Sequence, residues 1–165
     1  MTDERLGDGL WAALRRLPRG SGVVFRHYAT PALERRMLFR RVVRIARARG
    51  LVVVRAGEPA GFGEDGVHGH VGGQGLRTAP AHDRREAVTA VRRGAAVVFV
   101  SPVFATRSHP GVEALGARKA RRIARGLPVT VIALGGMDAR RFRGIAGFDG
   151  WAAIDAWNSG GSGAK

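Results

Sequence analysis

Groups that bind anions or transfer protons follow the apolar segments of this chain. After the apolar run at residues 96–100 comes the loop SPVFATRSHPG, whose polar side chains include Thr106, Arg107, Ser108 and His109. Hydroxyls beside a guanidinium and an imidazole suit a pyrophosphate, because charged and neutral donors can share its oxygens. A loop of solvated turn residues is the alternative. The loop is therefore a candidate anion site.

The pair His82-Asp83 follows another apolar segment and offers a group for proton transfer. An imidazole whose ring is oriented by a carboxylate can act as a general base near neutral pH. Asp83 also stands directly before a predicted helix, where aspartate is a preferred N-cap, and His82 would then only precede the helix. Both interpretations stay open at this point.

Gly135-Gly136 and Ile154-Asp155 are further candidate binding residues. Glycine reaches positive φ and lets a backbone approach a ligand closely, with its N–H groups directed at an anion. In barrels a phosphate site is often built from the loops after the seventh and eighth strands, and these two pairs occupy those positions. An ordinary tight turn is the alternative for the glycines, and the Asp155 carboxylate is an unfavourable neighbour for a phosphate.

Short apolar strands alternate with amphipathic helices along the chain. The sequence predicts helices at 6–17, 31–49, 83–93, 113–125 and 138–145, and strands at 23–25, 51–54, 65–68, 76–79, 96–100, 128–134 and 150–157. Strands separated by helices indicate a parallel sheet, and apolar strands fit burial on both faces. We predict a (β/α)8 TIM barrel whose first strand, before residue 6, is largely missing or incomplete.

The ends of the predicted strands indicate where a ligand would bind. Ligands of parallel α/β sheets lie beyond the carboxyl ends of the strands. Arg26 and Tyr28 follow the first predicted strand, and all five histidines also stand at strand ends, so we predict one polar mouth. His68 and His70 are spaced like metal ligands, but only Asp65 lies near them and the chain has no cysteine, so no metal site is predicted.

The composition limits the partners. The chain has 28 Lys and Arg against 13 Asp and Glu, and the net charge of +15 attracts nucleic acid, acidic lipid or phosphorylated small molecules. Nearly all the basic residues are arginine, and the codon bias of a GC-rich genome is an alternative explanation. Nucleic acid is disfavoured because few aromatic residues accompany the basic ones. No apolar run could span a membrane, and the acidic start is unlike a secretory signal, so we expect a cytoplasmic protein.

The sequence resembles the thiamine-phosphate synthase and TenI (thiazole tautomerase) family from about residue 20 to 157. SPVFATRSHPGVEALG is similar to that family's loop of type GPIFPTxTKxxxxxLG, VIALGGM to its strand and glycine pair, and GWAAIDAW to its last phosphate-binding strand. The resemblance implies a (β/α)8 barrel. It also implies a synthase that joins a hydroxymethylpyrimidine pyrophosphate to a thiazole phosphate, with magnesium, and releases pyrophosphate. The tautomerase branch transfers a proton on a thiazole phosphate carboxylate.

The resemblance also implies roles for individual residues. The catalytic groups would be His82 and His109, with His109 at the position of the family's loop lysine. The magnesium carboxylates align with Ala56-Gly57 and Gly73, so Mg²⁺ is implied by the resemblance while its expected ligands are not found. The pyrophosphate side would use Arg26, Thr106, Ser108 and His109, and the backbone amides of Gly135, Gly136 and Ile154 would hold the thiazole phosphate. Tyr28, Arg107 and Asp155 are the other candidate substrate-binding residues.

Three alternatives to an active synthase stay open. One is a tautomerase-like isomerase with a histidine base, and another is a catalytically degenerate relative that binds a phosphorylated ligand. The third, from a different class, is a basic nucleic-acid-binding protein.

We expect residues 1–157 to form a single domain and residues 158–165 a flexible tail. The first strand of the family ends in threonine-aspartate, which aligns with Thr2-Asp3, so Met1 looks like an internal methionine or the result of a truncation. A barrel that lacks one strand exposes sheet edges, which invites association into a homo-oligomer.

Overall fold

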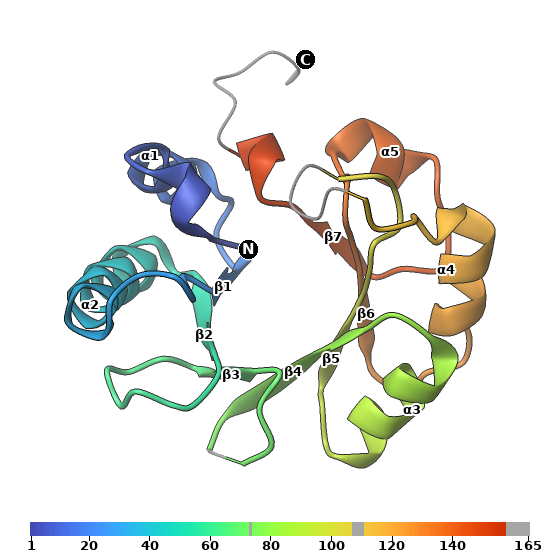
Figure 1. The fold of residues 1–165 in the computed structure, drawn as a ribbon, viewed down its shortest axis with the longest axis horizontal. Helices are drawn as coiled ribbons and strands as arrows, with labels where there is room; N and C mark the ends of the chain where they lie inside the picture. Colours follow the sequence, from blue (N-terminus) through green and yellow to red (C-terminus); the bar gives the residue numbers. More distant parts are fainter. Residues whose placement is uncertain (73, 107–110, 158–165) are drawn as a thin grey trace.

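Seven parallel strands form one sheet that curls around its own interior, and helices cover its outer side (Figure 1). The structure is a computed structural model that describes residues 1–72, 74–106 and 111–157; the predicted tail at 158–165 lies outside the described residues. The strands pair in sequence order: β1 (Gly22–Phe25), β2 (Val52–Ala56), β3 (Gly66–His68), β4 (Leu76–Ala81), β5 (Val97–Val100), β6 (Thr130–Leu134) and β7 (Gly150–Ala152). The helices are η1 (Glu4–Leu6), α1 (Gly9–Arg16), α2 (Ala32–Arg49), α3 (Arg84–Arg92), α4 (Gly116–Ala124), α5 (Ala139–Arg143) and η2 (Asp155–Trp157). The predicted incomplete barrel is confirmed.

Successive side chains along each strand point to opposite faces of the sheet, and both faces are apolar. Val24, Val54 and Phe99 point to the inside of the curl and pack together. Phe25 points outward, where its ring lies 4.8 Å from the ring of Phe39 on α2. Burial on both faces is the reason these strands are continuously apolar in the sequence.

Helices α3 and α4 lie against the other half of the sheet through small side chains. Ala87 of α3 and Ala120 of α4 are completely buried, and they pack in one cluster with Val98 of β5 and Val131 of β6. Small residues let the helices approach the strands closely. This packing fixes the carboxyl ends of β4, β5 and β6, where the candidate site lies.

Two aspartates play the same structural part at the start of two strands. The Asp65 carboxylate accepts a hydrogen bond from the Val53 N–H at 2.7 Å, and the Asp65 N–H donates to the Val53 carbonyl at 2.7 Å. In the same way, the Asp149 carboxylate accepts from the Val131 N–H at 2.7 Å, and the Asp149 N–H donates to the Val131 carbonyl at 2.9 Å. The Asp65 carboxylate is therefore engaged with a strand amide.

The first two residues lie between β1 and the end of β7 (Figure 1). Thr2 forms an isolated parallel bridge with Phe25, and its N–H donates to the Val24 carbonyl at 2.9 Å. The Met1 amino group donates to the Ala153 carbonyl at 2.9 Å. One short segment thus contacts both edges of the curled sheet, at the position of a strand that would complete the barrel.

The last strand is shorter than predicted. Residues 150–157 were expected to form one strand, but β7 ends at Ala152 and residues Asp155–Trp157 form the short helix η2. Strand β7 is the last strand of the sheet and pairs with β6 up to the register pair Leu134 and Ala152; among the described residues, no further strand pairing keeps the following residues extended. The rings of Trp151 and Trp157 stack at 5.5 Å as a packing pair.

Two helices also begin later than the apolar pattern indicated. The predicted helix 6–17 is divided at Gly7 into η1 and α1, because Gly7 has a positive φ of 46° that a helix does not contain. Helix α4 begins at Gly116 instead of residue 113. Among the described residues, no helix is long and apolar enough to cross a membrane.

Candidate functional site

A cavity of about 360 Å³ lies at the carboxyl ends of the strands, inside the mouth of the curled sheet. It brings together predicted residues from five separate parts of the chain: Arg26, His82, Thr106, Gly135, Gly136, Ile154 and Asp155. Ser101, Pro102, Leu134 and Ala153 also contribute to its walls. The predicted convergence of strand-end residues is therefore present for this set.

The remaining predicted residues lie elsewhere or outside the described residues. Arg107, Ser108 and His109 are outside the described residues. Tyr28 does not line the cavity; its side chain is 62% exposed, and its ring lies 5.7 Å from the Arg26 guanidinium carbon.

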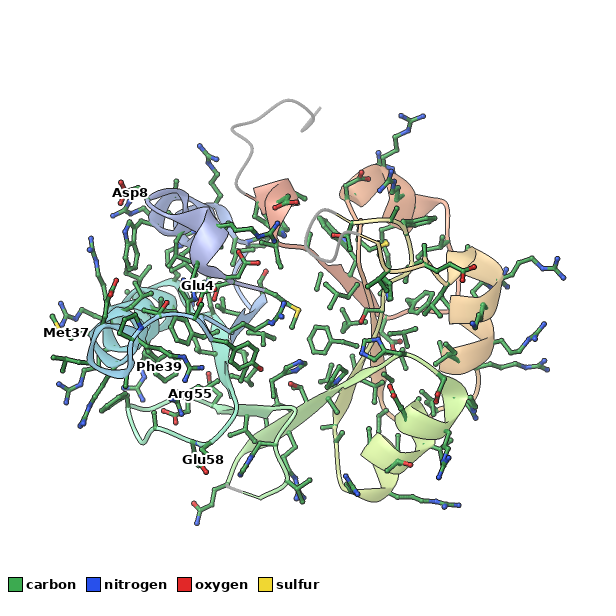
Figure 2. All side chains as sticks on the ribbon, in the orientation of Figure 1. Glu4, Asp8, Met37, Phe39, Arg55 and Glu58 are labelled. Atoms are coloured by element: carbon green, nitrogen blue, oxygen red, sulfur yellow. The ribbon has the colours of Figure 1, made fainter. Side chains whose placement is uncertain are left out.

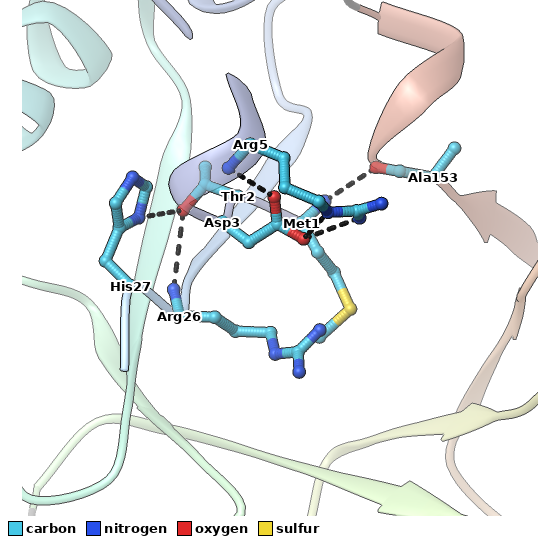
Figure 3. Close-up of polar contacts among 7 residues, drawn as sticks. All are labelled: Met1, Thr2, Asp3, Arg5, Arg26, His27 and Ala153. Carbon is cyan, nitrogen blue, oxygen red and sulfur yellow. Dashed lines mark hydrogen bonds and ion pairs between the residues drawn. The ribbon is translucent and has the colours of Figure 1, made fainter. Parts of the chain in front are cut away.

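Arg26 enters the cavity because it continues the inward-facing side of β1, two residues after Val24. Its N–H lies 3.4 Å from the Thr2 hydroxyl (Figure 3). The next residue, His27, turns the other way: its ring stacks on Phe25 at 4.6 Å, and its Nδ1 lies 3.1 Å from the same hydroxyl. Burial lowers the pKa of His27, which favours its neutral form, and the ring packs against Phe25.

His82 has a fixed ring orientation. Its Nδ1 lies 2.7 Å from the Ser101 carbonyl oxygen. A carbonyl can only accept a hydrogen bond, so Nδ1 carries the proton and Nε2 of the neutral ring is an acceptor. His82 lines the cavity, and its Nε2 can accept a proton as a general base would. The ring is oriented by the backbone carbonyl of Ser101, the residue directly after β5.

Asp83 does not orient His82. Its carboxylate accepts a hydrogen bond from the Glu86 N–H at 2.8 Å, which is the N-cap contact of α3. The Glu86 carboxylate in turn accepts from the His82 N–H at 2.7 Å. Of the two interpretations that the sequence left open, the helix cap is the one present.

Gly135 and Gly136 adopt a backbone that other residues would not tolerate. Their φ angles are 95° and 58°. A Cβ on Gly135 would lie 2.7 Å from Pro102 Cα, and one on Gly136 would collide with the Ala105 carbonyl oxygen. The two glycines therefore let β6 and the loop after β5 approach each other, and they place bare backbone on the cavity wall.

His68 lies inside the barrel with 5% of its surface exposed. Its Nδ1 lies 2.8 Å from the Thr78 hydroxyl, and its ring meets Phe99 edge-on at 5.3 Å. Burial lowers the pKa of His68 to about 4, and the charge of Arg26 lowers it further. Of the four histidines among the described residues, only His82 lines the cavity, so the predicted single mouth does not gather them all.

The described residues do not form a magnesium site. None of their His, Asp and Glu side chains gather in a group of three or more that could hold a metal ion. Asp155 is the one carboxylate on the cavity wall within the described part of the chain. Magnesium prefers several oxygen ligands in octahedral geometry, and one carboxylate on a wall that also carries Arg26 does not fit it.

The fold and the site define the class as an incomplete parallel α/β barrel with an arginine, a glycine pair and an oriented imidazole at the carboxyl ends of its strands. A model of the thiamine monophosphate synthase family matches residues 69–157, more than half of the chain. This chain belongs to that family. The match begins after β3, so Arg26 lies outside it.

Individual relatives agree with this assignment. A thiamine-phosphate synthase of Chloroflexus aurantiacus is 34% identical over 87 residues, which cover 51% of this chain and 40% of that protein. The alignment thus spans less than half of the relative. The solved thiamine phosphate pyrophosphorylase of Pyrococcus furiosus has a TM-score of 0.81 at 20% identity, over 96% of this chain and 86% of that one. A designed cube-shaped, porous protein cage has a TM-score of 0.64 at 12% identity, over 94% of this chain and 62% of that one. These two structures show the fold alone.

Proposed function

We propose that this chain is a transferase of the thiamine-phosphate synthase type, which joins a hydroxymethylpyrimidine pyrophosphate to a thiazole phosphate and releases pyrophosphate. The observation that carries the proposal is the single cavity that holds Arg26 and Thr106 together with Gly135, Gly136 and Ile154. Two anionic groups must be held at once in this reaction, and the cavity is lined by a guanidinium at one part and by the backbone of the glycine pair at another.

The glycine pair and Ile154 are assigned to the thiazole phosphate. Consecutive residues at positive φ can turn backbone N–H groups toward a shared anion, and Gly135 and Gly136 have this conformation. Arg26 and Thr106 are assigned to the pyrophosphate. In the reaction the thiazole nitrogen forms a bond to the pyrimidine methylene carbon, while the carbon–oxygen bond to pyrophosphate breaks and the oxygen leaves with the electron pair. The task of the protein is to orient both partners and to balance the charge on the leaving group.

The test is product formation from the two substrates by the purified chain. We expect thiamine phosphate, detected by chromatography, and loss of most product in the variant Arg26→Gln. Arg44→Gln is the matched control, because Arg44 is an exposed arginine of α2 away from the cavity. Absence of product with the unaltered chain, or an equal loss in both variants, would contradict the proposal.

A tautomerase-like isomerase is the second candidate, and the geometry of His82 favours it. The Ser101 carbonyl holds the imidazole with Nε2 available as a base, and a proton transfer on a thiazole phosphate carboxylate needs no metal. If the chain has this activity, a carbon-bound proton of the substrate should exchange with deuterium in D₂O, which proton NMR detects. The exchange should be lost in the variant His82→Gln. A His82→Gln variant that forms thiamine phosphate at the rate of the unaltered chain, with no exchange in either protein, would leave only the synthase.

A further inference from the structure

A groove with a basic wall lies at the opposite end of the barrel from the mouth. Its volume is about 840 Å³, and it runs between α4 and the segment that leads into β7. Arginines of α4 line it, and Leu127, Val129 and Phe148 are its half-buried apolar residues. These three residues precede β6 or β7, so the groove lies at the amino ends of the strands. It shares no residue with the wall of the candidate site.

The arginines lie together on the outer side of α4. Arg118, Arg121 and Arg122 are three and four residues apart, which places them side by side on a helix. Arg125 follows directly after the last residue of α4, and all four side chains are exposed. From Arg118 to Arg125 the chain advances about 10 Å along the helix axis, enough to meet more than one phosphate of a nucleic-acid strand. Figure 2 shows long side chains that extend from α4 away from the sheet.

The positive charge of this groove is not balanced within the described part of the chain. None of the four guanidiniums forms an ion pair there. Asp149 brings the one carboxylate among the lining residues, and this group accepts a hydrogen bond from the Val131 N–H at 2.7 Å. Arg84 of α3 donates to the carbonyls of Ile123 and Arg125 at 2.8 and 2.7 Å, which places a further cation at the negative end of the helix dipole. The groove therefore attracts anions.

The fold brings an aromatic ring into this basic groove. Few aromatic residues accompany the basic ones along the chain, which disfavoured nucleic acid, but Phe148 lines the groove together with the arginines. The backbone next to it passes close to α4, because a Cβ added to Gly147 would lie 3.9 Å from Arg121 Cγ. Proteins that bind single strands of nucleic acid combine a positively charged groove, which follows the phosphates, with aromatic rings that stack on bases.

We infer that this groove binds single-stranded nucleic acid, with the arginines on the phosphates and the Phe148 ring against a base. The inference does not depend on the proposed function, because the groove and the cavity lie at opposite ends of the strands. An acidic polypeptide would meet the same arginines, but its carboxylates offer no flat ring for Phe148. A membrane surface is flat, whereas this site is a groove.

The first test is the binding of a short labelled single-stranded DNA to the full chain, measured by fluorescence anisotropy between about 50 and 200 mM salt. The triple variant Arg118→Gln, Arg121→Gln and Arg122→Gln should weaken binding by about tenfold or more. It should also reduce the slope of the logarithm of affinity against the logarithm of salt concentration by about 2, because each phosphate of a single strand contributes about 0.7.

The matched control removes three exposed arginines from α1 and α2, on the other side of the curled sheet (Figure 1). This triple variant, Arg15→Gln, Arg16→Gln and Arg44→Gln, has the same change of net charge and should weaken binding less than threefold. Circular dichroism shows whether each variant is folded. If the α4 variant fails to fold, the comparison of two DNA strands with the unaltered chain, described next, decides the outcome.

The second test separates base stacking from attraction of any polyanion. An abasic strand of the same length has the same phosphates but no bases, so it should bind the unaltered chain about fivefold or more weakly than the normal strand. Phe148→Leu keeps an apolar side chain in the groove and removes the ring. It should weaken binding of the normal strand to the level of the abasic strand and leave the abasic strand unchanged. Phe142→Leu is its control, because Phe142 packs on the same core cluster but does not line the groove.

Several results would overturn the inference. These are equal losses in the two triple variants, equal affinity of the normal and abasic strands, or tighter binding of polyglutamate or of phosphatidylserine vesicles than of DNA. Formation of thiamine phosphate should be the same in the α4 variant as in the unaltered chain. Nucleic-acid binding by a chain that forms no thiamine phosphate would support the inference and contradict the proposed function, so the two fail separately.

Discussion

Replacement of Gly135 by alanine should damage both the stability of the barrel and the cavity wall. Gly135 has φ of 95°, and a Cβ there would lie 2.7 Å from Pro102 Cα and 2.8 Å from Pro102 Cβ. The left-handed backbone costs a non-glycine residue about 1 to 2 kcal/mol. The clash adds about 1 to 3 kcal/mol, because the backbone after β5 must move. The sum is about 2 to 5 kcal/mol, a large part of the roughly 5 to 15 kcal/mol that stabilises a typical domain.

Gly147→Ala is the matched control for this variant. Gly147 has φ of 86°, and a Cβ there would meet nothing closer than an ordinary contact of 3.9 Å with Arg121. It therefore carries the same backbone strain without the clash, and it lies before β7, away from the mouth. Urea unfolding followed by tryptophan fluorescence should show Gly135→Ala less stable than Gly147→Ala by the clash term of about 1 to 3 kcal/mol. Product formation should fall only in Gly135→Ala. Equal stability and equal activity of the two variants would refute the close approach of β6 to the loop after β5.

Two further predictions concern the buried groups on either side of the sheet. Because burial holds the pKa of His68 at about 4, against about 6.5 in the unfolded chain, the unfolded chain binds the extra proton between these values. Acidification through this range should therefore lower the free energy of unfolding, by on the order of 3 kcal/mol once the range is crossed. The variant His68→Gln should show a flatter dependence of the free energy of unfolding on pH. The same pH dependence in the variant and the unaltered chain would contradict the lowered pKa of His68. Phe39→Ala should lower the free energy of unfolding, measured with urea, by about 3 to 5 kcal/mol, because Phe39 is buried in the outer core. Met37 lies on the exposed side of the same helix (Figure 2), so Met37→Ala should change this free energy by less than about 0.5 kcal/mol. Similar losses in both variants would contradict the orientation of α2.

Much of the fold could be predicted from local patterns. The strand ending at Phe25 and the helix from Ala32 to Arg49 have nearly the predicted bounds, because continuous apolar runs and a terminal glycine at Gly50 are local signals. Strand β7 was predicted too long, because its end depends on where β6 stops offering hydrogen bonds, and that is decided by pairing across the sheet. The two aspartates that begin β3 and β7 were missed as a repeated feature, because their role is a contact with another strand.

The sequence by itself determined which residues stand at the ends of the strands, since alternation and strand order follow from side-chain polarity along the chain. Arg26, His82 and Gly135 meet in one cavity for that reason. Only the tertiary structure decided which of these groups is used for packing and which faces a ligand. His27 and His68 stand at strand ends like His82, yet they are buried against Phe25 and Thr78. The bond from Arg35 to the Ala56 carbonyl has no signal in the sequence, because Arg35 lies within a helix rich in arginine and reaches the end of β2 only when α2 packs on the strands. The pattern of polar and apolar residues along the chain determines the order of strands and helices. The direction in which each side chain points depends on neighbours that are distant in the chain.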